Sequence, residues 1–460
     1  MKNLILFISF LLLSSCAEIL YLDLSLQGKQ RLSKPNKDYV KSQEKFTAYI
    51  NGIKMYDQQF LGISVYDMNQ KKYVIDYNQH KYFTPASNVK LFSFFAGLNF
   101  IGDSIPSLRY ISRNDSLIFW GTGDPTFLHQ DLQDSVQKTF HFLKNSPKKL
   151  FFSSNNFDEQ PLGYGWAWDD YQEYFSAEKS SFPIYGNIVR FDLIPKQDLQ
   201  TSPAYFRQFS KLKLDLSKDE FKVNRDWANN NFRYSYPNLK EKVQTDVPFK
   251  SSDSWIVRLL SDTLKKDVQL IDLKMPDSAK VLYSNSSKEM YRRMLQVSDN
   301  FLAEQILLLC AQKLKSNLIN SDSLIKLISK KKLTDLTDPP VWVDGSGLSR
   351  YNLFTPHSFV EILLKIYELK AKDQENETEL FDLLPTGGKT GTIRNMYKDH
   401  APFIFAKTGT LSNNHCLSGY LLTKSGKKLC FSFMNNHFVG NLAEVKLQMS
   451  KIMTDFYLYY

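Results

Sequence analysis

Residues 89–98 read "VKLFSFFAGL", a run whose apolar side chains would cover nearly the whole circumference of a helix. A helix without a polar face is buried on all sides, so this run predicts a helix in the middle of a domain. Ser87 and Lys90 stand at its beginning. A serine in the first turn of such a helix is held rigidly beside unpaired N–H groups, and Lys90 would share its face. The pair is therefore a candidate nucleophile with its base.

The Ser-x-x-Lys spacing is a weak signal when it stands alone. A lysine also lies three residues after Ser42, Ser146, Ser176, Ser210, Ser323, Ser329 and Ser425. Most of these matches must be accidental, so the assignment of Ser87 depends on the rest of the chain.

The length of 460 residues predicts two or three domains, because single cores stop growing at roughly 250–300 residues. Hydrophobic residues make up 43% of the chain, enough for packed cores. Strand-like pieces such as "SLIFWGTGDPTF", "KKLFFSSNNF" and "FDLIPKQDL" characterise residues 105–280. We interpret this region as one or two inserted β-rich modules.

The regions on either side of the insert have regular patterns. "FLGISVYDMNQKKYVIDY" predicts two strands joined by a turn, which lead directly to Ser87. "KEMYRRMLQVSDNFLAEQILLLCAQKL" keeps helical spacing of its apolar residues. Near the end, "PFIFAKTGTL", "CLSGYLLTK" and "KLCFSFMNN" predict a strand meander, and "LAEVKLQMSKIMTDFYLYY" predicts a closing amphipathic helix.

Residues 1–16, "MKNLILFISFLLLSSC", have the features of an export signal: an early lysine, a short apolar stretch, and small polar residues before Cys16. The ending resembles a bacterial lipobox, in which the cysteine carries the lipid. A spanning anchor is the alternative, but the stretch is shorter than the roughly 20 residues it would need. We therefore expect an exported lipoprotein that is held to a membrane by its N-terminal lipid and faces the periplasm of a bacterial cell envelope.

The remaining cysteines are Cys310, Cys416 and Cys430, an odd number without paired metal-ligand spacing, and we interpret them as buried thiols. A two-residue turn at residues 425–426 would place Cys416 opposite Asn435, so a Cys416–Cys430 disulfide is not favoured. The scattered histidines predict no metal, and we expect no cofactor.

The net charge of +10 comes from lysines spread along the chain. Nucleic-acid binding would require a concentrated basic patch with interleaved aromatic residues, and the sequence has only short clusters such as "SKKKL". The charge is typical of a solvated surface in an anionic envelope, and we expect no nucleic-acid partner.

Two later motifs distinguish Ser87 from the other serines. Ser298-Asp299-Asn300 opens a predicted helix, and Lys407-Thr408-Gly409-Thr410 lies on a predicted strand. Each is weak alone, because Ser-x-Asn and Lys-Thr-Gly recur elsewhere in the chain. In this order and setting, the three motifs form the constellation of penicillin-binding proteins and serine β-lactamases.

Catalysis through an acyl-enzyme explains the residue types in these motifs. Lys90, close to a serine and to other cations, can lose its proton and serve as the base. Ser298 can relay a proton to the departing amine, and Asn300 can hold the substrate amide.

The Lys-Thr-Gly-Thr motif supplies groups for the other end of the substrate. Lys407 with Thr408 and Thr410 can bind a terminal carboxylate beyond the scissile bond, and Gly409 belongs to the same motif. The N–H groups of Ser87 and Thr410 would form the oxyanion hole, in which one donor contributes about 3–4 kcal/mol in other hydrolases.

The chain resembles the D-alanyl-D-alanine carboxypeptidase/endopeptidase family of low-molecular-mass class C penicillin-binding proteins, the S13 serine peptidases. The resemblance runs through "TPASNVKL", "GTGDPTF", "GWAWDDY", "SDNFLAEQ", "DGSGLSRYNLFTP", "LPTGGKTGTIRN" and "AKTGTLSNNHCLSGYL". Ser87 and Ser298 are 211 residues apart, far more than a compact β-lactamase needs, and the strand-rich region fills this gap.

The resemblance implies an α+β fold with a transpeptidase domain of the penicillin-binding and serine β-lactamase type. Its antiparallel sheet, flanked by helices, would be formed from residues 17–104 and 281–460 and interrupted by the insert at 105–280. The implied activity is hydrolysis of the D-Ala-D-Ala bond of peptidoglycan stem peptides, of cross-links between them, or of both, and β-lactam antibiotics would acylate Ser87.

The resemblance also suggests a substrate-reading residue and shows some departures. In this family an acidic residue of Trp-x-Trp-Asp-Asp can read a free amine on the peptide, and Asp170 matches it best; the alternative is a surface acid that caps a turn. Lys389 stands where relatives commonly carry an aspartate, so we interpret its Lys-Thr-Gly as a loop. The segment "SAEKSSFPIYGNIVRF" matches poorly, and residues 344–350, "DGSGLSR", are expected to be scaffold.

Two other functions stay open on this reading. One is a β-lactamase or esterase on the same fold, which fast deacylation would distinguish. The other is a catalytically silent protein that binds the cell wall, against which the intact set of motif residues argues.

Overall fold

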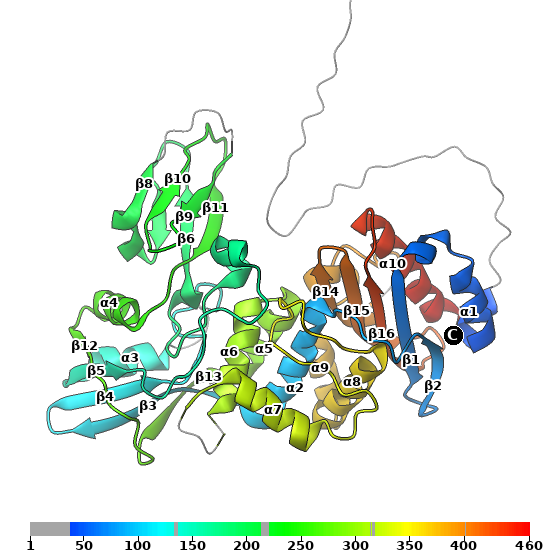
Figure 1. Cartoon of the computed structure of the whole chain (residues 1–460), viewed down its shortest axis with the longest axis horizontal. Coiled ribbons are helices and arrows are strands. Elements are labelled where there is room, and N and C mark those ends of the chain that lie inside the picture. Colours follow the sequence, from blue (N-terminus) through cyan, green and yellow to red (C-terminus); the bar gives the residue numbers. More distant parts are fainter. Residues whose placement is uncertain (1–36, 133–136, 213–219, 313, 315–317, 401) are drawn as a thin grey trace, which may run out of the picture. The chain divides into compact units, whose positions relative to one another are not determined.

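Both ends of the chain contribute strands to one five-stranded antiparallel sheet (Figure 1). Its order is β14-β15-β16-β1-β2, and Ile63 of β1 lies opposite Phe433 of β16 at the seam. The strands are β1 Phe60–Asp67, β2 Lys72–Tyr77, β14 Ile404–Leu411, β15 Asn414–Leu422 and β16 Lys428–Asn436. The predicted hairpin before Ser87 and the predicted late meander are therefore neighbours in one sheet.

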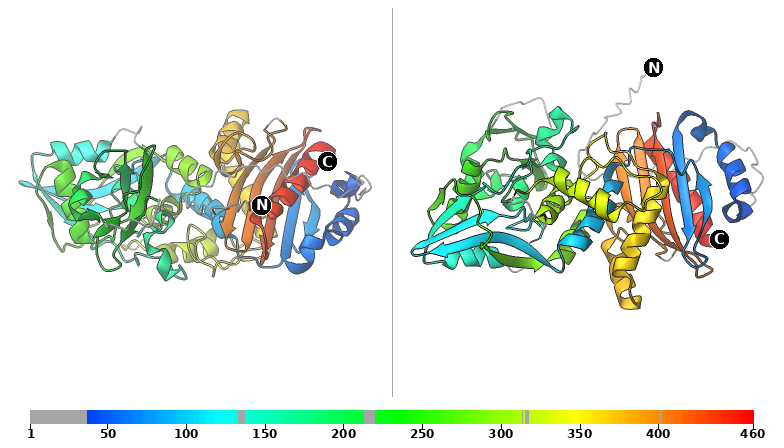
Figure 2. Two further views of the ribbon diagram at one scale, coloured as in Figure 1. Left: turned by 90° about the horizontal axis from the view of Figure 1, so that it is seen from above. Right: turned by 60° about the horizontal axis from the view of Figure 1, so that its bottom comes forward.

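Helices cover both faces of this sheet (Figure 2). On one face, Phe92, Leu302 and Phe359 share a core with side chains of β15 and β16. On the other face, Phe46 and Phe456 pack with residues of β1 and β16. The first core belongs to α2 Lys90–Phe100, α6 Asn300–Ala311 and α8 Pro356–Lys370, and the second to α1 Gln43–Asn51 and α10 Leu442–Tyr459. The apolar run after Ser87 thus forms the predicted buried helix, α2.

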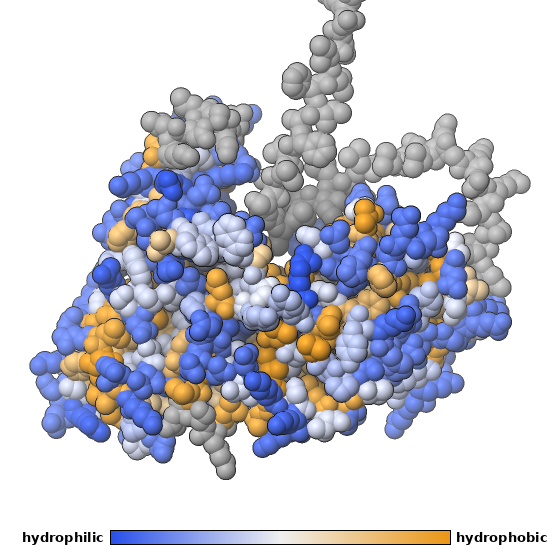
Figure 3. Space-filling view, viewed as in Figure 1, coloured by the Kyte–Doolittle hydropathy of each residue, from blue (hydrophilic) through white to orange (hydrophobic). Residues whose placement is uncertain are grey.

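The structure is a computed structural model that describes residues 37–132, 137–212, 220–312, 314, 318–400 and 402–460. The predicted export signal and Cys16 lie outside the described residues. None of the described helices is both long enough and apolar enough to span a membrane. On the face seen in Figure 3, hydrophilic residues predominate and hydrophobic residues form small separate patches.

The predicted insert at 105–280 is rich in strands, and together with β13, which extends past residue 280, they form three further sheets. A five-stranded sheet has the order β12-β5-β4-β3-β13, and two three-stranded sheets have the orders β11-β6-β7 and β8-β10-β9. The strands are β3 Ser104–Arg113, β4 Ser116–Gly121, β5 Lys149–Ser153, β6 Ile188–Leu193, β7 Gln200–Ser202, β8 Ser210–Leu212, β9 Val223–Arg225, β10 Phe232–Tyr234, β11 Val243–Pro248, β12 Val268–Leu270 and β13 Lys280–Ser286. Residues 38–460 form one compact unit, so the boundaries at 104 and 280 stay predictions.

The remaining α-helices lie between these elements along the chain. They are α3 Lys138–Asn145, α4 Asp253–Leu264, α5 Ser287–Gln296, α7 Ser321–Lys332 and α9 Gln374–Leu383. The helical pattern predicted from residue 288 onward corresponds to two helices, α5 and α6. Residues 297–299 separate them, because Asp299 caps the N-terminus of α6.

The three described cysteines are buried thiols, as expected, and they form no disulfide with one another. The turn between β15 and β16 is longer than predicted: Leu422 pairs with Lys428, so Cys416 lies opposite Met434 and not opposite Asn435. A longer turn shifts the register of every pair behind it.

Candidate active site

Ser87 lies in a single turn of 3-10 helix, η3 Ala86–Val89, which leads directly into α2. The sequence predicted Ser87 within the first turn of the helix itself, but the α-helix begins at Lys90. Ala86 has a φ of 49°, a strained left-handed conformation that raises the energy of this turn. Ser87 is partly exposed whereas Lys90 is 0% exposed, so the Ser87 hydroxyl can be reached from solvent and Lys90 is shielded from water.

Lys90 donates to three oxygen atoms. Its Nζ lies 2.9 Å from Ser87 Oγ, 2.6 Å from Asn300 Oδ1 and 2.7 Å from the Ser346 carbonyl oxygen. A neutral amine has only two N–H donors and one lone pair. If Asn300 and Ser346 accept these two hydrogens, the lone pair of neutral Lys90 points to the Ser87 hydroxyl. The geometry therefore suits a general base.

The charge of Lys90 is controlled by its surroundings. Burial lowers the pKa of Lys90 to about 8, although the carboxylates of Asp344, Glu304 and Asp299 act in the opposite direction. Removing an ammonium from water disfavours its charged form. A lysine with this pKa is neutral in an appreciable fraction of molecules near neutral pH.

Lys407 connects the other two motifs. Its Nζ donates to Ser298 Oγ at 2.8 Å and to the Thr408 carbonyl oxygen at 2.6 Å. Lys407 is fully buried on β14, and burial, followed by the positive charge of Lys90, places its pKa well below the usual value. The two lysines therefore disfavour each other's charge.

The Ser298-Asp299-Asn300 motif is placed at the start of α6. Ser298 has a φ of 63°, and Asp299 Oδ1 caps the helix by accepting from the Leu302 N–H at 3.0 Å. Asn300 Nδ2 donates to the Phe175 carbonyl oxygen at 3.0 Å, while its Oδ1 accepts from Lys90. Both the oxygen and the nitrogen of the Asn300 side-chain amide thus bind groups of the protein. The sequence predicted a contact with the substrate amide and did not predict these two contacts.

The two threonines of the strand motif differ in exposure. Thr408 is buried and its hydroxyl donates to Thr392 Oγ1 at 2.7 Å. Thr392 follows the second Lys-Thr-Gly, which lies in the turns after α9 rather than on a strand. Thr410 is exposed, and its Oγ1 lies 2.8 Å from His415 Nδ1.

Two glycines lie against the turn that carries Ser87. A Cβ at Gly347 would stand 1.9 Å from the Ala86 carbonyl oxygen. A Cβ at Gly409 would stand 2.5 Å from the Pro85 carbonyl oxygen and 2.9 Å from the Ser87 nitrogen. Only glycine permits so close an approach of two backbones, so the turn is held between residue 347 and the Lys-Thr-Gly motif.

The loop of residues 344–347 supports Lys90 from behind. Ser346 N donates to Glu304 Oε1 at 2.7 Å, and Gly347 N donates to Asp344 Oδ1 at 2.8 Å. Burial, followed by the charge of Asp344, raises the pKa of Glu304 to about 7. These contacts fit the scaffold expected for this loop. Sequence patterns alone did not identify Glu304, because an acidic residue on the mostly apolar helix at 301–311 is unusual but gives no indication of its partner.

Asp170 lies apart from this hydrogen-bonded cluster. It belongs to the 3-10 helix η4 Trp168–Gln172 and is partly exposed. Burial and the neighbouring Asp169 raise the pKa of Asp170, and Arg350 opposes this shift. In the described part of the chain, no hydrogen bond joins its carboxylate to the Ser87 cluster. Among the described residues, no group of His, Cys, Asp or Glu side chains is arranged to hold a metal ion.

Comparison with known proteins identifies the family of this chain. The model of the D-Ala-D-Ala carboxypeptidase 3 (S13) family matches residues 43–456. D-alanyl-D-alanine carboxypeptidase DacB of Haemophilus influenzae is 23% identical over 423 residues, with coverage of 83% of this chain and 86% of that protein.

Two solved structures have the same fold. Penicillin binding protein 4 (dacB) of Haemophilus influenzae superposes with a TM-score of 0.70 at 20% identity, covering 88% of this chain and 100% of that chain. The same protein in complex with a β-lactam superposes with a TM-score of 0.65 at 19% identity, with the same coverage. These likenesses confirm the predicted penicillin-binding fold.

Proposed function

Since the chain belongs to the D-Ala-D-Ala carboxypeptidase 3 (S13) family and is a serine-type D-Ala-D-Ala carboxypeptidase, we propose that it acts through an acyl-enzyme on Ser87 with Lys90 as the base. The observation that carries this proposal is the set of three contacts made by Lys90 Nζ. Two oxygen atoms fix the amine, and the third is the hydroxyl that must lose its proton.

In the acylation step, neutral Lys90 takes the proton of Ser87 as Oγ attacks the carbonyl carbon between the two D-alanines. The N–H groups of Ser87 and Thr410 hold the negative charge that forms on the carbonyl oxygen. A neutral Lys90 no longer repels the charge of Lys407, and the terminal carboxylate of the bound substrate would offset the effect of burial on its pKa, so in this mechanism Lys407 carries the ammonium. The C–N bond breaks as Ser298 gives its proton to the leaving nitrogen and receives one from Lys407, and free D-alanine departs.

Deacylation reverses these proton transfers. A water molecule attacks the ester carbonyl from the side that D-alanine has left, and its proton passes through Ser298 to the now neutral Lys407. The ester bond breaks as Lys90 returns its proton to Ser87. Both lysines recover their initial charge, and one positive charge is shared between them throughout the cycle.

The strand motif and η4 would determine which peptide is cleaved. Thr410, with Lys407 and Thr408, would bind the terminal carboxylate, and Gly409 would let this strand approach the Ser87 turn. Asp170 would bind a free amine on the peptide side chain. This amine is free in an uncrosslinked stem peptide and is part of an amide bond in a cross-link. We include cleavage of cross-links in this proposal.

Acylation by a β-lactam tests the proposal directly. Soluble protein lacking residues 1–16 is incubated with benzylpenicillin, its intact mass is recorded, and the adduct is mapped by digestion. We expect a long-lived adduct on Ser87 that Ser87→Ala abolishes. Ser323→Ala serves as the matched control, because Ser323 also has a lysine three residues on and lies exposed on α7.

The other outcomes of this experiment each favour a different function. A short-lived adduct with rapid hydrolysis of the drug would favour a β-lactamase. The complete absence of an adduct would favour a silent protein that binds the cell wall.

The N-terminal sequence supports a finer proposal on location. We propose that Cys16 becomes the lipid-bearing first residue after cleavage of residues 1–15, which anchors the enzyme to a membrane with its catalytic domain in the periplasm. Metabolic labelling with a fatty acid should mark the wild-type protein and not Cys16→Ser. Labelling that survives in Cys16→Ser would disprove the assignment.

A further inference from the structure

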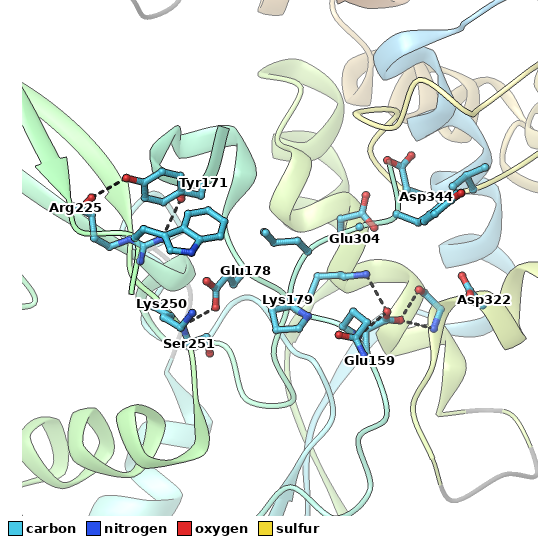
Figure 4. Close-up of a pocket in the computed structure, with 18 residues that line it drawn as sticks. Glu159, Tyr171, Glu178, Lys179, Arg225, Lys250, Ser251, Glu304, Asp322 and Asp344 are labelled. Carbon is cyan, nitrogen blue, oxygen red and sulfur yellow. Dashed lines mark hydrogen bonds and ion pairs between the residues drawn. The ribbon is translucent and has the colours of Figure 1, made fainter. Parts of the chain in front are cut away.

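A cavity of about 460 Å³ lies beside the active site (Figure 4). Glu304 and Asp344, which support the loop behind Lys90, form part of its wall. The opposite wall comes from the predicted insert. The residues of this segment between 159 and 179 line the cavity at several points and also supply Phe175, whose carbonyl oxygen binds Asn300. The segments that line the cavity therefore also contact the candidate catalytic residues.

Exposed aromatic rings surround this cavity. Tyr164 and Trp227 line it, although 75% and 52% of their surfaces are exposed. Tyr351, 55% exposed, stacks on Tyr164 with ring centroids 5.1 Å apart, and Trp168, 73% exposed, lies edge-on to Trp227 at 6.2 Å. Burial of rings of this size is energetically favourable, because it removes a large apolar surface from water. A cluster of exposed rings therefore indicates a binding surface.

The interior of the cavity carries charged groups of both signs. Lys179 and Glu159 form a buried ion pair at 3.0 Å, and Glu178 accepts from the Ser251 N–H at 2.8 Å. Arg225 is 3% exposed, and its Nε has no hydrogen-bond partner among the described residues. The basic lining residues are Lys179, Arg225 and Lys250, and the acidic ones are Glu159, Glu178, Glu304, Asp322 and Asp344.

This combination matches the chemistry of a sugar. A pyranose ring presents apolar C–H groups that stack on aromatic rings, and its hydroxyl and acetamido groups both donate and accept hydrogen bonds. Mixed donors and acceptors suit such a neutral ligand better than an anion, because the acidic lining residues outnumber the basic ones.

We propose that the cavity and its four-ring rim bind the sugar chain of peptidoglycan, a polymer of N-acetylated amino sugars, while the attached stem peptide reaches Ser87. This inference rests on the proposed function, since it assumes a substrate in which sugar and peptide are covalently joined. Tyr164 and Trp227 are not among the groups that would bind the peptide, although Asp170 shares its 3-10 helix with Trp168, so sugar binding can be tested through these two rings.

The first test measures binding without reaction. Uncharged oligosaccharide strands of N-acetylglucosamine, which carry no peptide, are titrated against the full chain, and binding is followed by tryptophan fluorescence and calorimetry. We expect saturable binding that is weakened about tenfold or more when Tyr164→Ala and Trp227→Ala are combined. Tyr236→Ala is the matched control, because Tyr236 is an exposed tyrosine of the same insert that does not line the cavity.

The second test compares two substrates of identical peptide sequence, one with and one without its disaccharide. The wild-type protein should have the higher kcat/KM on the sugar-bearing peptide, and the double variant should lose this preference. Failure of the wild-type protein to bind the strands, or equal binding by the double variant, would overturn the proposal. Binding of strands without acylation of Ser87 would instead contradict the proposed function alone.

Discussion

Substitution of Gly347 by alanine tests how the Ser87 turn is held. The new Cβ would stand 1.9 Å from the Ala86 carbonyl oxygen and 3.1 Å from the Ser87 nitrogen, at a φ of 82°. Left-handed backbone costs a residue with a Cβ about 1–2 kcal/mol, and overpacking of a rigid site adds about 1–3 kcal/mol. We therefore expect Gly347→Ala to lower the free energy of unfolding by about 2–5 kcal/mol.

Gly426→Ala separates these two contributions. Gly426 has a φ of 86°, but no atom lies within 4 Å of a Cβ built there, so this variant should lose only about 1–2 kcal/mol. Urea denaturation of both variants gives the difference. A shift of about 1 Å in a reacting atom costs about 100-fold in rate, so we also expect acylation by benzylpenicillin to slow by about that factor in folded Gly347→Ala and to stay unchanged in Gly426→Ala. Equal destabilisation of the two variants, with normal acylation, would refute the packing argument.

Three further predictions concern catalysis. Glu304→Gln removes a carboxylate that raises the pKa of Lys90. The rate of acylation increases with pH as Lys90 loses its proton, so in this variant the rate should begin to rise at lower pH. An unshifted pH profile would show that Glu304 does not act on Lys90. Ser298→Ala should slow D-alanine release by about 100- to 10,000-fold without loss of folding, as measured by single-turnover kinetics and circular dichroism. Asp170→Asn should lower kcat/KM for peptides with a free side-chain amine and leave their N-acetylated forms unchanged; an equal loss on both would assign Asp170 a structural role.

Local patterns in the sequence predicted much of the catalytic domain. The hairpin before Ser87, the late strand meander and the C-terminal helix all appear where their periodicity placed them. Such patterns report on neighbouring residues, because the spacing of apolar side chains is set by the geometry of one helix or strand. The register between β15 and β16 was less predictable, since one longer turn moved Cys416 opposite Met434.

The support of the active site could not be found in this way. The carbonyl oxygen of Ser346 accepts from Lys90, although the two residues are 256 positions apart in the sequence. Because every residue has a backbone carbonyl, the residue type gives no indication of this contact. Glu304 acts on the same loop from α6, and a carboxylate buried on an apolar helix can be interpreted only when its partner is known.

The sequence alone predicted the candidate reacting groups, the order of the three motifs and most of the secondary structure around them, because motif chemistry and apolar periodicity are local properties. The tertiary structure decided which oxygens hold the Lys90 amine, how closely Gly347 and Gly409 approach Ser87, and that the aromatic rings of the insert gather beside the active site. These features depend on packing between segments hundreds of residues apart, and their energies arise only when burial removes water from the groups concerned.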